Sequence, residues 1–264
     1  MPDFLATILR GRREDVAAAQ RTCPLAELQQ RAYIERDRRR PFARHLAETP
    51  PPALIAEIKR ASPSRGPLAP DLDPAALARA YEEGGAAALS VLTEPHFFRG
   101  SPADLQAARS ATTLPVLRKD FLFCEYQIWE SLAMGADAVL LIVRLLDPVL
   151  LKDLFALATE LGLDAVVEAA APEETERAVA LGASLIALNA RDLQTFEVDP
   201  DRPARLAPPP RPGQTVIAAS GIGGPEDIRR LRDSGLTAFL VGESLVRASD
   251  PAEAVRRLRK AWSS

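Results

Sequence analysis

Short apolar runs recur along most of the chain, and within them apolar residues do not alternate with polar ones. Such runs are typical of parallel strands that are buried on both faces. Amphipathic segments lie between them and predict helices, several of which place proline in the first turn behind a capping side chain, as in Asp73-Pro74. The predicted strands are residues 54–58, 88–92, 115–117, 138–143, 165–168, 185–188, 216–219 and 238–241.

Eight evenly spaced strand–helix units predict an α/β protein with the (β/α)8 fold, the TIM barrel. A doubly wound open sheet is the alternative. Its dinucleotide form needs GxGxxG after the first strand, whereas here that strand runs into Lys59-Arg60-Ala61-Ser62-Pro63. The length of 264 residues suits one barrel. We therefore expect a single barrel domain over residues 1–264.

About fifty residues precede the first predicted strand. Apolar positions at helical spacing in two stretches, 4–9 and 25–32, predict two helices there. Residues 1–50 are therefore expected to form a two-helix extension packed on the barrel. The sixth helix of the barrel has the weakest pattern and is expected within residues 199–206.

The composition, with 47% hydrophobic and 26% charged residues, is that of an ordinary soluble globular protein. No apolar run approaches the roughly 20 residues of a membrane helix, and the N-terminus does not resemble a signal peptide. We therefore expect a cytoplasmic protein with no membrane contact. The arginine-rich stretch 36–40 is interpreted as a solvated helix face, because the net charge is −3 and no aromatic residues interleave with the arginines. No nucleic-acid partner is expected.

The residues of other chemistries are few. Cys23 and Cys124 lack CxxC spacing and are expected to be free, reduced thiols. His45 and His96 are far apart in the sequence, which argues against a histidine metal site or a Ser-His-Asp triad. No metal site is predicted.

Polar and ionisable residues gather where the predicted strands end. In a (β/α)8 barrel the active site lies at the carboxyl ends of the strands. A charged side chain that leaves a buried strand is costly unless it is paired or used, so convergence of several predicts a site. Glu57 is the most readily explained by structure alone, through an ion pair with Lys59 or Lys119. The strand-end residues are Glu57, Lys59, Lys119, Asp120, Glu168, Asn189, Arg191 and Ser220.

Glycine-bearing loops follow the seventh and eighth predicted strands, at 220–224 and 241–244. In barrels this pair of loops commonly binds phosphate, because backbone N–H groups and a helix N-terminus point at the anion. The alternative is that Gly221 and Gly242 only permit tight turns. The residues by themselves predict a phosphorylated small-molecule substrate and acid–base chemistry, and they leave a Schiff-base lysine enzyme open.

Six segments resemble signatures of the indole-3-glycerol-phosphate synthase family, in the family's order. The resemblance implies conversion of 1-(2-carboxyphenylamino)-1-deoxyribulose 5-phosphate into indole-3-glycerol phosphate, CO2 and water, a step of tryptophan biosynthesis that needs no cofactor. The oligomeric state stays open, with a monomer favoured. The segments are IAEIKRASPS (55–64), SVLTEPHFFRGS (90–101), LRKDF (117–121), ADAVLLIV (136–143), LNARDL (188–193) and ASGI (219–222).

The same resemblance implies roles for individual residues. Lys119 would be the general acid that protonates the substrate ketone, and Glu168 the general base of the later dehydration. Lys59 would contact the anionic substrate and share the acid role. Burial and a second lysine are expected to lower the pKa of Lys119 toward neutrality, where an acid works best. The other implied site residues are Glu57, Asn189 and Arg191 as orienting groups, Ser62, Ser220, Gly221, Gly242 and Glu243 around the phosphate, and Phe98, Phe121, Leu140 and Leu193 around the aromatic ring.

One position departs from the family pattern. Ala219 stands where the family has a glutamate before Ser-Gly, and Ala169-Ala170 replaces a bulkier pair. A natural variant, an engineered substitution and a barrel with weakened catalysis are all open. The intact acid, base and phosphate loops favour an active enzyme over a barrel that only binds the phosphorylated ligand. Phosphoribosylanthranilate isomerase, the neighbouring barrel of the pathway, would need a Cys/Asp pair at strand ends, and Cys124 does not supply one.

Overall fold

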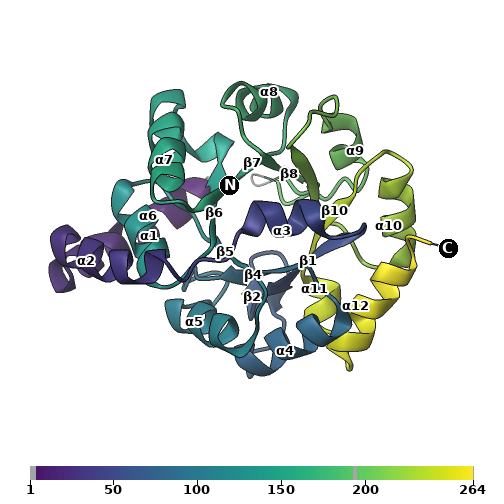
Figure 1. The fold of residues 1–264 in the computed structure, drawn as a ribbon, viewed down its shortest axis with the longest axis horizontal. Helices are drawn as coiled ribbons and strands as arrows, with labels where there is room; N and C mark the ends of the chain where they lie inside the picture. The colour runs from purple at the N-terminus through teal and green to yellow at the C-terminus, as the bar shows by residue number, and fades with distance from the viewer. Residues whose placement is uncertain (1–3, 193–194, 264) are drawn as a thin grey trace.

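In the computed structural model, which describes residues 4–192 and 195–263, eight parallel strands close into a barrel (Figure 1). Each strand pairs with the next along the chain, and β10 returns to β1 with Ala53 opposite Ala238. The eight predicted strands and the TIM-barrel fold are thus confirmed. The strands are β1 (Ala53–Ile58), β4 (Ala88–Leu92), β5 (Val116–Lys119), β6 (Ala138–Ile142), β7 (Asp164–Ala169), β8 (Leu185–Asn189), β9 (Thr215–Ala219) and β10 (Ala238–Val241).

Helices that follow the strands form the outer ring of the barrel (Figure 1). The predicted caps are present: the Asp73 carboxylate accepts from the N–H groups of Ala75 and Ala76 at 2.9 and 3.2 Å, and three other helices are capped similarly. These helices are α4 (Pro74–Gly84), α5 (Pro102–Ala111), α6 (Glu125–Ala133), α7 (Pro148–Glu160), α8 (Pro172–Ala180), α9 (Arg202–Leu206), α10 (Pro225–Arg232), α11 (Glu243–Val246) and α12 (Pro251–Lys260), with a 3-10 turn, η1 (Val143–Leu145).

The interior of the barrel is a packed core. Alternate residues of each strand point inward, and one buried cluster joins Ile55, Leu117, Val166, Leu185 and Ile217 across the barrel. The other residues of the strands pack outward against the helices in two further clusters. Because the interior is filled, a ligand can bind only at an end of the barrel.

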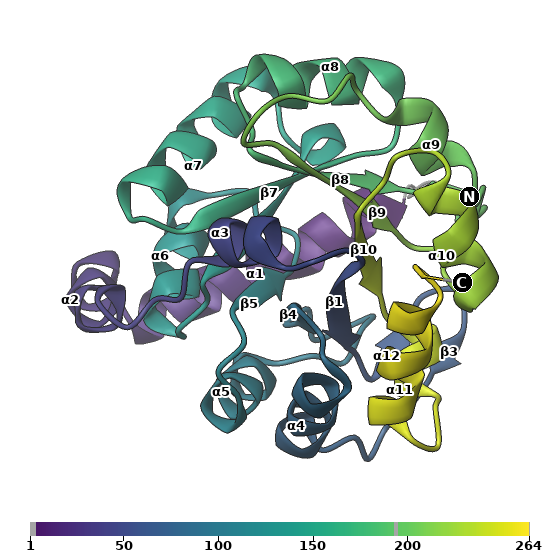
Figure 2. The ribbon, with the colours of Figure 1, turned by 45° about the vertical axis from the view of Figure 1, so that its right-hand side comes forward.

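Three helices precede β1: α1 (Phe4–Thr22), α2 (Leu25–Arg36) and α3 (Phe42–Glu48). The two predicted helices are present. Helix α3 was not predicted, because seven residues are too few to show a clear helical pattern. It lies across the amino-terminal end of the barrel (Figures 1 and 2), where Phe42 and Leu46 join the interior cluster. The Ala43 N–H donates to Asp164 at 2.9 Å. This helix therefore closes the end of the barrel remote from the predicted site.

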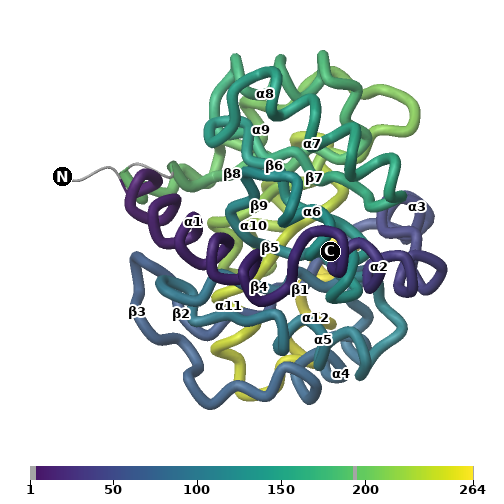
Figure 3. The backbone as a smooth tube through the Cα atoms, turned by 90° about the vertical axis from the view of Figure 1, so that its left-hand side faces the viewer, coloured from purple at the N-terminus to yellow at the C-terminus, as the bar shows by residue number. Residues whose placement is uncertain are grey.

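Helix α1 lies at the opposite end, behind the barrel in Figure 2 and along the near side in Figure 3. The Phe4 ring packs edge-on against Phe97 and Phe196, which belong to the loops after β4 and β8. Leu5 and Ile8 join the cluster of the barrel interior. The extension therefore contributes a helix to each end of the barrel, and α1 borders the carboxyl end, where the site is predicted.

The interpretation of residues 36–40 as a solvated helix face was right for the exposure of residues 36–38 but wrong for the helix and for Arg40. Helix α2 ends at Arg36, and the following residues run along the barrel. Arg40 donates through Nη1 to the Leu114 carbonyl at 2.6 Å, and its N–H donates to Asp137 at 2.7 Å. Burial, together with nearby Arg109, lowers the pKa of Arg40. Arg40 is thus held by a backbone carbonyl that is distant in the sequence, and a local pattern of charges does not reveal such a contact.

Three further findings concern the rest of the chain. Cys23 and Cys124 are free thiols, as expected. Over residues 4–192 and 195–263, none of the helices is long and apolar enough to span a membrane. The same residues contain no group of three or more His, Cys, Asp or Glu side chains arranged to hold a metal ion.

Candidate active site

Two ion pairs meet at the carboxyl end of the barrel. Lys119 Nζ, from the end of β5, donates to Glu168 Oε2 of β7 at 3.0 Å. Asn189 of β8 donates to the other oxygen of Glu168 at 3.1 Å. Lys59 Nζ lies 2.8 Å from Glu57 Oε1, which is one of the two pairings expected for Glu57. The barrel thus brings together five of the residues predicted from strand ends.

The predicted direction of the Lys119 pKa shift was wrong. Burial lowers the pKa of Lys119, but the charges of Glu168 and Glu57 outweigh burial and raise it above its ordinary value. The reason is that each lysine has a carboxylate as its nearest neighbour, whereas the sequence suggested a second lysine in that place. Lys119 is therefore a protonated ammonium at neutral pH, which suits a group that must donate a proton.

A hollow of about 380 Å³ opens beside these pairs and is rich in cations. Lys59, Arg65, Arg191 and Arg247 line it, against two carboxylates, Glu57 and Glu243, so its lining carries a net positive charge. Gly221 and Gly242 also line it, which places both predicted phosphate loops at one wall. A cavity of this kind is suited to a phosphate group.

The backbone of these loops is shaped for an anion. Ser220 and Gly221 have φ values of 66° and 71°, and such a conformation is uncommon for serine. Strain of this kind is often found at functional sites. Glu243 and Ser244 begin α11, where the first N–H groups of a helix have no acceptor within it. The Ser244 hydroxyl donates to the Ile222 carbonyl at 3.1 Å and holds the two loops together.

A second, smaller hollow of about 80 Å³ lies on the other side of Glu57. Phe98 and Phe121, whose ring centroids are 6.2 Å apart, form its aromatic walls, and Leu140 supplies the predicted aliphatic wall. Lys119 and Glu168 also line it. Glu57 lines both hollows, so the mouth has a cationic half and an aromatic half joined at the two ion pairs.

Three further residues of the predicted site are Ser62, Arg191 and Leu193. Ser62 lies in β2 (Ala61–Ser62), which pairs with β3 (Gly66–Pro67) in the loop after β1, and it is not part of the lining of either hollow. Its buried hydroxyl has no hydrogen-bond partner in the part of the chain described. Arg191 donates through Nη1 to the Phe196 carbonyl at 3.0 Å, and burial lowers its pKa. Leu193 lies outside the described residues.

The methyl group of Ala219 occupies the place of the missing carboxylate. Ala219 ends β9, between Asn189 of β8 and Leu240 of β10 in the strand register, and it is 2% exposed. It belongs to the cluster of inward-facing side chains. A glutamate there would project into the mouth beside Asn189.

Sequence reasoning missed several residues of the mouth. Arg65 and Arg247 line the cationic hollow, but arginines in loops carry no distinctive pattern. Glu94 is fully buried, and its carboxylate accepts from the N–H groups of residues 96, 97 and 98 at 2.8–2.9 Å. It therefore shapes the loop that presents Phe98. A carboxylate two residues after an apolar strand was the available signal.

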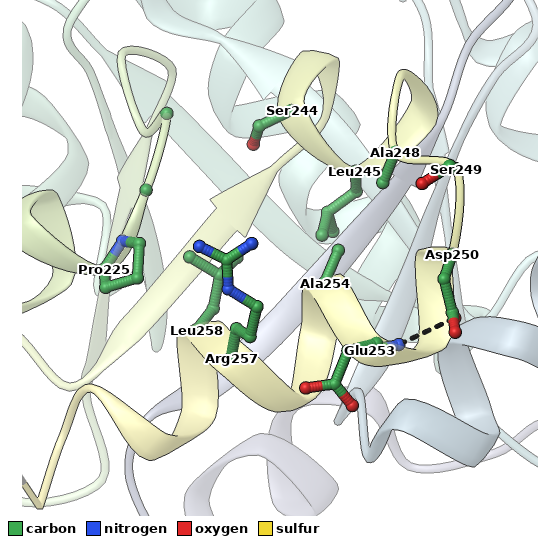
Figure 4. A pocket seen from close by; sticks show the side chains of 12 residues that line it. Pro225, Ser244, Leu245, Ala248, Ser249, Asp250, Glu253, Ala254, Arg257 and Leu258 are labelled. Atoms are coloured by element: carbon green, nitrogen blue, oxygen red, sulfur yellow. Dashed lines mark hydrogen bonds between the residues drawn. The ribbon is translucent and has the colours of Figure 1, made fainter.

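A groove next to the cationic hollow is lined by α10, α11 and α12 (Figure 4). It shares Gly223 and Ser244 with that hollow. Its acidic side chains have structural roles: Asp250 caps α12 by accepting from the Glu253 N–H at 2.9 Å, and Glu253 pairs with Arg256 at 2.9 Å. The lysines and carboxylates of the mouth do not line this groove, so we place the site in the mouth.

Gly242→Ala is expected to raise the KM for a phosphorylated substrate about tenfold, the loss of roughly one charge-assisted hydrogen bond. Gly242 has an ordinary φ of −125°, so space is the constraint. A Cβ there would clash with Glu57 Oε1 and would lie 2.9 Å from Lys59 Nζ. Steady-state kinetics measure the effect, with exposed Ser249→Ala as the control. An unchanged KM would mean that the Glu57–Lys59 pair does not contribute to binding.

Comparison with known proteins agrees with this geometry. Residues 5–258 match the model of the family described as indole-3-glycerol phosphate synthase. The chain is 49% identical to the indole-3-glycerol phosphate synthase of Desulfosudis oleivorans, over 98% of this chain and 99% of that protein. It is 47% identical to that of Syntrophobacter fumaroxidans over the full length of both.

Solved structures of lower identity share the fold. A 3-hexulose-6-phosphate synthase from Salmonella typhimurium superposes with a TM-score of 0.61 at 15% identity, over 80% of this chain and 98% of that one. A thiamine phosphate pyrophosphorylase from Pyrococcus furiosus gives 0.60 at 19% identity, over 80% of this chain and 94% of that one. Likeness at this level shows the barrel alone. The family match and the close relatives show more: this chain belongs to the indole-3-glycerol phosphate synthase family.

Proposed function

We propose that this barrel converts 1-(2-carboxyphenylamino)-1-deoxyribulose 5-phosphate into indole-3-glycerol phosphate, CO2 and water, as its family membership indicates. The carrying observation is the Lys119–Glu168 ion pair, which lines an aromatic hollow that shares Glu57 with a cationic one. The substrate has a phosphate at one end and a carboxyphenyl ring at the other. The two halves of the mouth match these two ends.

Binding would fold the flexible substrate across the ion pairs. Its phosphate would lie at the loops that carry Gly221 and Gly242, near Arg65 and Arg247. Its ring would lie between Phe98 and Phe121, with Leu140 against one edge. Holding the ring carbon against the ketone replaces an improbable conformation of the free molecule, and such placement alone accelerates a reaction strongly.

In the first step, the ring carbon that bears the carboxylate attacks the ketone carbon. Lys119 donates its proton to the ketone oxygen, which becomes a hydroxyl group as the new carbon–carbon bond forms. The carboxylate then leaves as CO2, and the electrons of the broken bond restore the aromatic ring. Lys59, which is paired with Glu57, would contact the anionic groups of the substrate.

In the last step, the new hydroxyl group leaves as water and the second ring becomes aromatic. Glu168 removes a proton from the neighbouring carbon, which was the CH2 group beside the ketone, while Asn189 holds one of the carboxylate oxygens of Glu168 in place. The hydroxyl group takes a proton from the Lys59 ammonium, which shares the acid role, and departs as water. Glu57 orients Lys59, and Arg191 assists at the substrate carboxylate. Lys119 and Glu168 are paired in the free enzyme. The proton that Glu168 takes up can therefore pass to Lys119 and restore the acid.

The reaction as drawn requires no metal or cofactor, because the acid, the base and the electron flow are supplied by the side chains and the substrate. As a biosynthetic enzyme acting on a soluble phosphorylated metabolite, the protein is proposed to work in the cytoplasm. We also propose that it works as a monomer, because one chain supplies both halves of the mouth.

Ala219→Glu is expected to raise kcat about tenfold. A carboxylate beside Asn189 would accept from a substrate hydroxyl, and a hydrogen bond to a charged group contributes about 1.5–3 kcal/mol. Ala219→Gln, of the same size but uncharged, is the matched control in steady-state kinetics. If Ala219→Glu leaves turnover unchanged or lowers it, position 219 is not a missing part of this chain's catalysis.

The reaction itself is tested by incubating the protein with the carboxyphenylamino substrate in the presence of EDTA. We expect indole-3-glycerol phosphate, followed by its fluorescence, and CO2 in equal amounts. Substrate that binds, as measured by calorimetry, without forming either product would instead support a barrel that only binds the phosphorylated ligand.

A further inference from the structure

The carboxylate of Asp120 is buried beside the aromatic hollow and accepts five hydrogen bonds. Arg12 of α1 donates to it through Nε and Nη2 at 3.1 and 2.9 Å. Arg118 Nη2 donates at 2.9 Å, the Thr93 hydroxyl at 2.7 Å and the Phe121 N–H at 2.8 Å. Asp120, Arg12 and Arg118 are 1%, 6% and 1% exposed. A charged group this well enclosed is costly unless its geometry is strictly kept.

Asp120 lines the aromatic hollow together with its two neighbours in the chain. Lys119 precedes it at the end of β5, and Phe121 follows it. Resting on the function proposed above, we propose that Asp120 is a positioning residue: anchored by Arg12 and Arg118, it holds Lys119 and Phe121 in the geometry that ring closure requires. On one side of Asp120, the Phe121 N–H donates to its carboxylate at 2.8 Å. On the other side, the Lys119 carbonyl accepts from the N–H of Thr93, whose hydroxyl also donates to Asp120.

Helix α1 takes part in the same arrangement through Arg12. Arg12 also pairs with Asp15 at 2.7 Å, and Asp15 lies 3.0 Å from His96 Nε2 in the loop that carries Phe98. Gly11 permits this approach, because a Cβ there would already lie 3.3 Å from the His96 ring. The chain of contacts therefore runs from α1 to both aromatic walls, and Arg12 joins α1 to Asp120, directly after the acid-bearing strand.

The electrostatics support this geometry. Burial raises the pKa of Asp120, but Arg118 and Arg12 outweigh burial and keep it below its ordinary value, so the carboxylate remains ionised. The pKa of Lys119, in contrast, is raised by Glu168 and Glu57. A substitution at Asp120 is therefore expected to change the pKa of Lys119 mainly by moving Lys119 away from Glu168. That distinguishes positioning from a direct electrostatic effect.

The test compares Asp120→Asn, Arg12→Met and Arg12→Lys with wild type in steady-state kinetics and in the pH dependence of kcat/KM. Exposed Arg10→Met on the same helix is the matched control. We expect Asp120→Asn to lower kcat at least about tenfold, since small misplacements of reacting groups are costly, and to move the alkaline limb to lower pH. Arg12→Met should lose several-fold in kcat/KM, and Arg12→Lys should recover part of that loss.

Assays are run well below the melting temperature of each variant, so that loss of folded protein does not contribute. Melting temperatures that fall while kcat and the alkaline limb stay at wild-type values would show a purely structural role and overturn the proposal. Failure of the function would look different, because wild type itself would then form no product. If wild type is active and depends on Lys119, the variants at 12 and 120 decide this inference alone.

Discussion

Lys119→Ala is expected to lower kcat by about 10³-fold, within the 10²–10⁴-fold range typical of a general acid. The ammonium group is the one cation in the aromatic hollow's lining among the described residues, and it lies 3.0 Å from the proposed base. Steady-state fluorescence of the indole product measures the loss. Without Lys119 the ketone oxygen would receive no proton as the ring closes, so both CO2 and indole formation should stop.

Lys152→Ala is the control for this variant, because Lys152 is an exposed lysine on the outer helix α7. Lys119→Met separates chemistry from folding, since it fills part of the space and carries no proton. We expect Lys119→Met to be as inactive as Lys119→Ala and Lys152→Ala to match wild type. Substantial turnover in both Lys119 variants would move the acid role to Lys59.

Glu168→Gln is expected to lower kcat by between about 10² and 10⁴-fold, the contribution typical of a general base. The amide keeps the size of the side chain and a hydrogen-bond acceptor for Asn189, which donates to Glu168 at 3.1 Å. It cannot remove a proton. The exposed Glu226 of α10 offers a matched control, Glu226→Gln. Wild-type turnover by Glu168→Gln would exclude Glu168 as the base.

The same variant tests the electrostatics of the acid. Glu168 raises the pKa of Lys119, so its neutralisation should lower that pKa. Lys119 would then lose its proton at a lower pH, and the alkaline limb of the remaining activity should shift toward neutrality. An alkaline limb at the wild-type position would show that the Lys119–Glu168 pair does not form in solution.

Most of the fold was predictable because the barrel repeats one local pattern. The strands are buried on both faces and read as continuous apolar runs, and Asp73, Ser101, Asp147 and Asp250 mark helix starts by capping them. The site followed from topology, because parallel strands carry their last residues to one rim. Lys119, Glu168 and Asn189 meet there for that reason.

What the sequence did not reveal depends on contacts between distant segments. The pKa of Lys119 is set by which neighbour is nearest, and Glu168 lies 49 residues away along the chain. Arg40 is held by carbonyls at the ends of other elements. The pairing of Arg12 with Asp120 spans 108 residues. Helical spacing places Arg12 on the buried face of α1, but it does not identify Asp120 as the partner.

The division of labour between Lys119 and Glu168 is tested most directly by single-turnover experiments that follow CO2 and indole together. Wild type should release both in equal amounts. Glu168→Gln should release CO2 while an undehydrated intermediate accumulates, because the base acts after the carboxylate has left. Lys119→Ala should release neither. If Glu168→Gln formed CO2 and indole in step, or if Lys119→Ala still released CO2 at the wild-type rate, the proposed roles of acid and base would be contradicted.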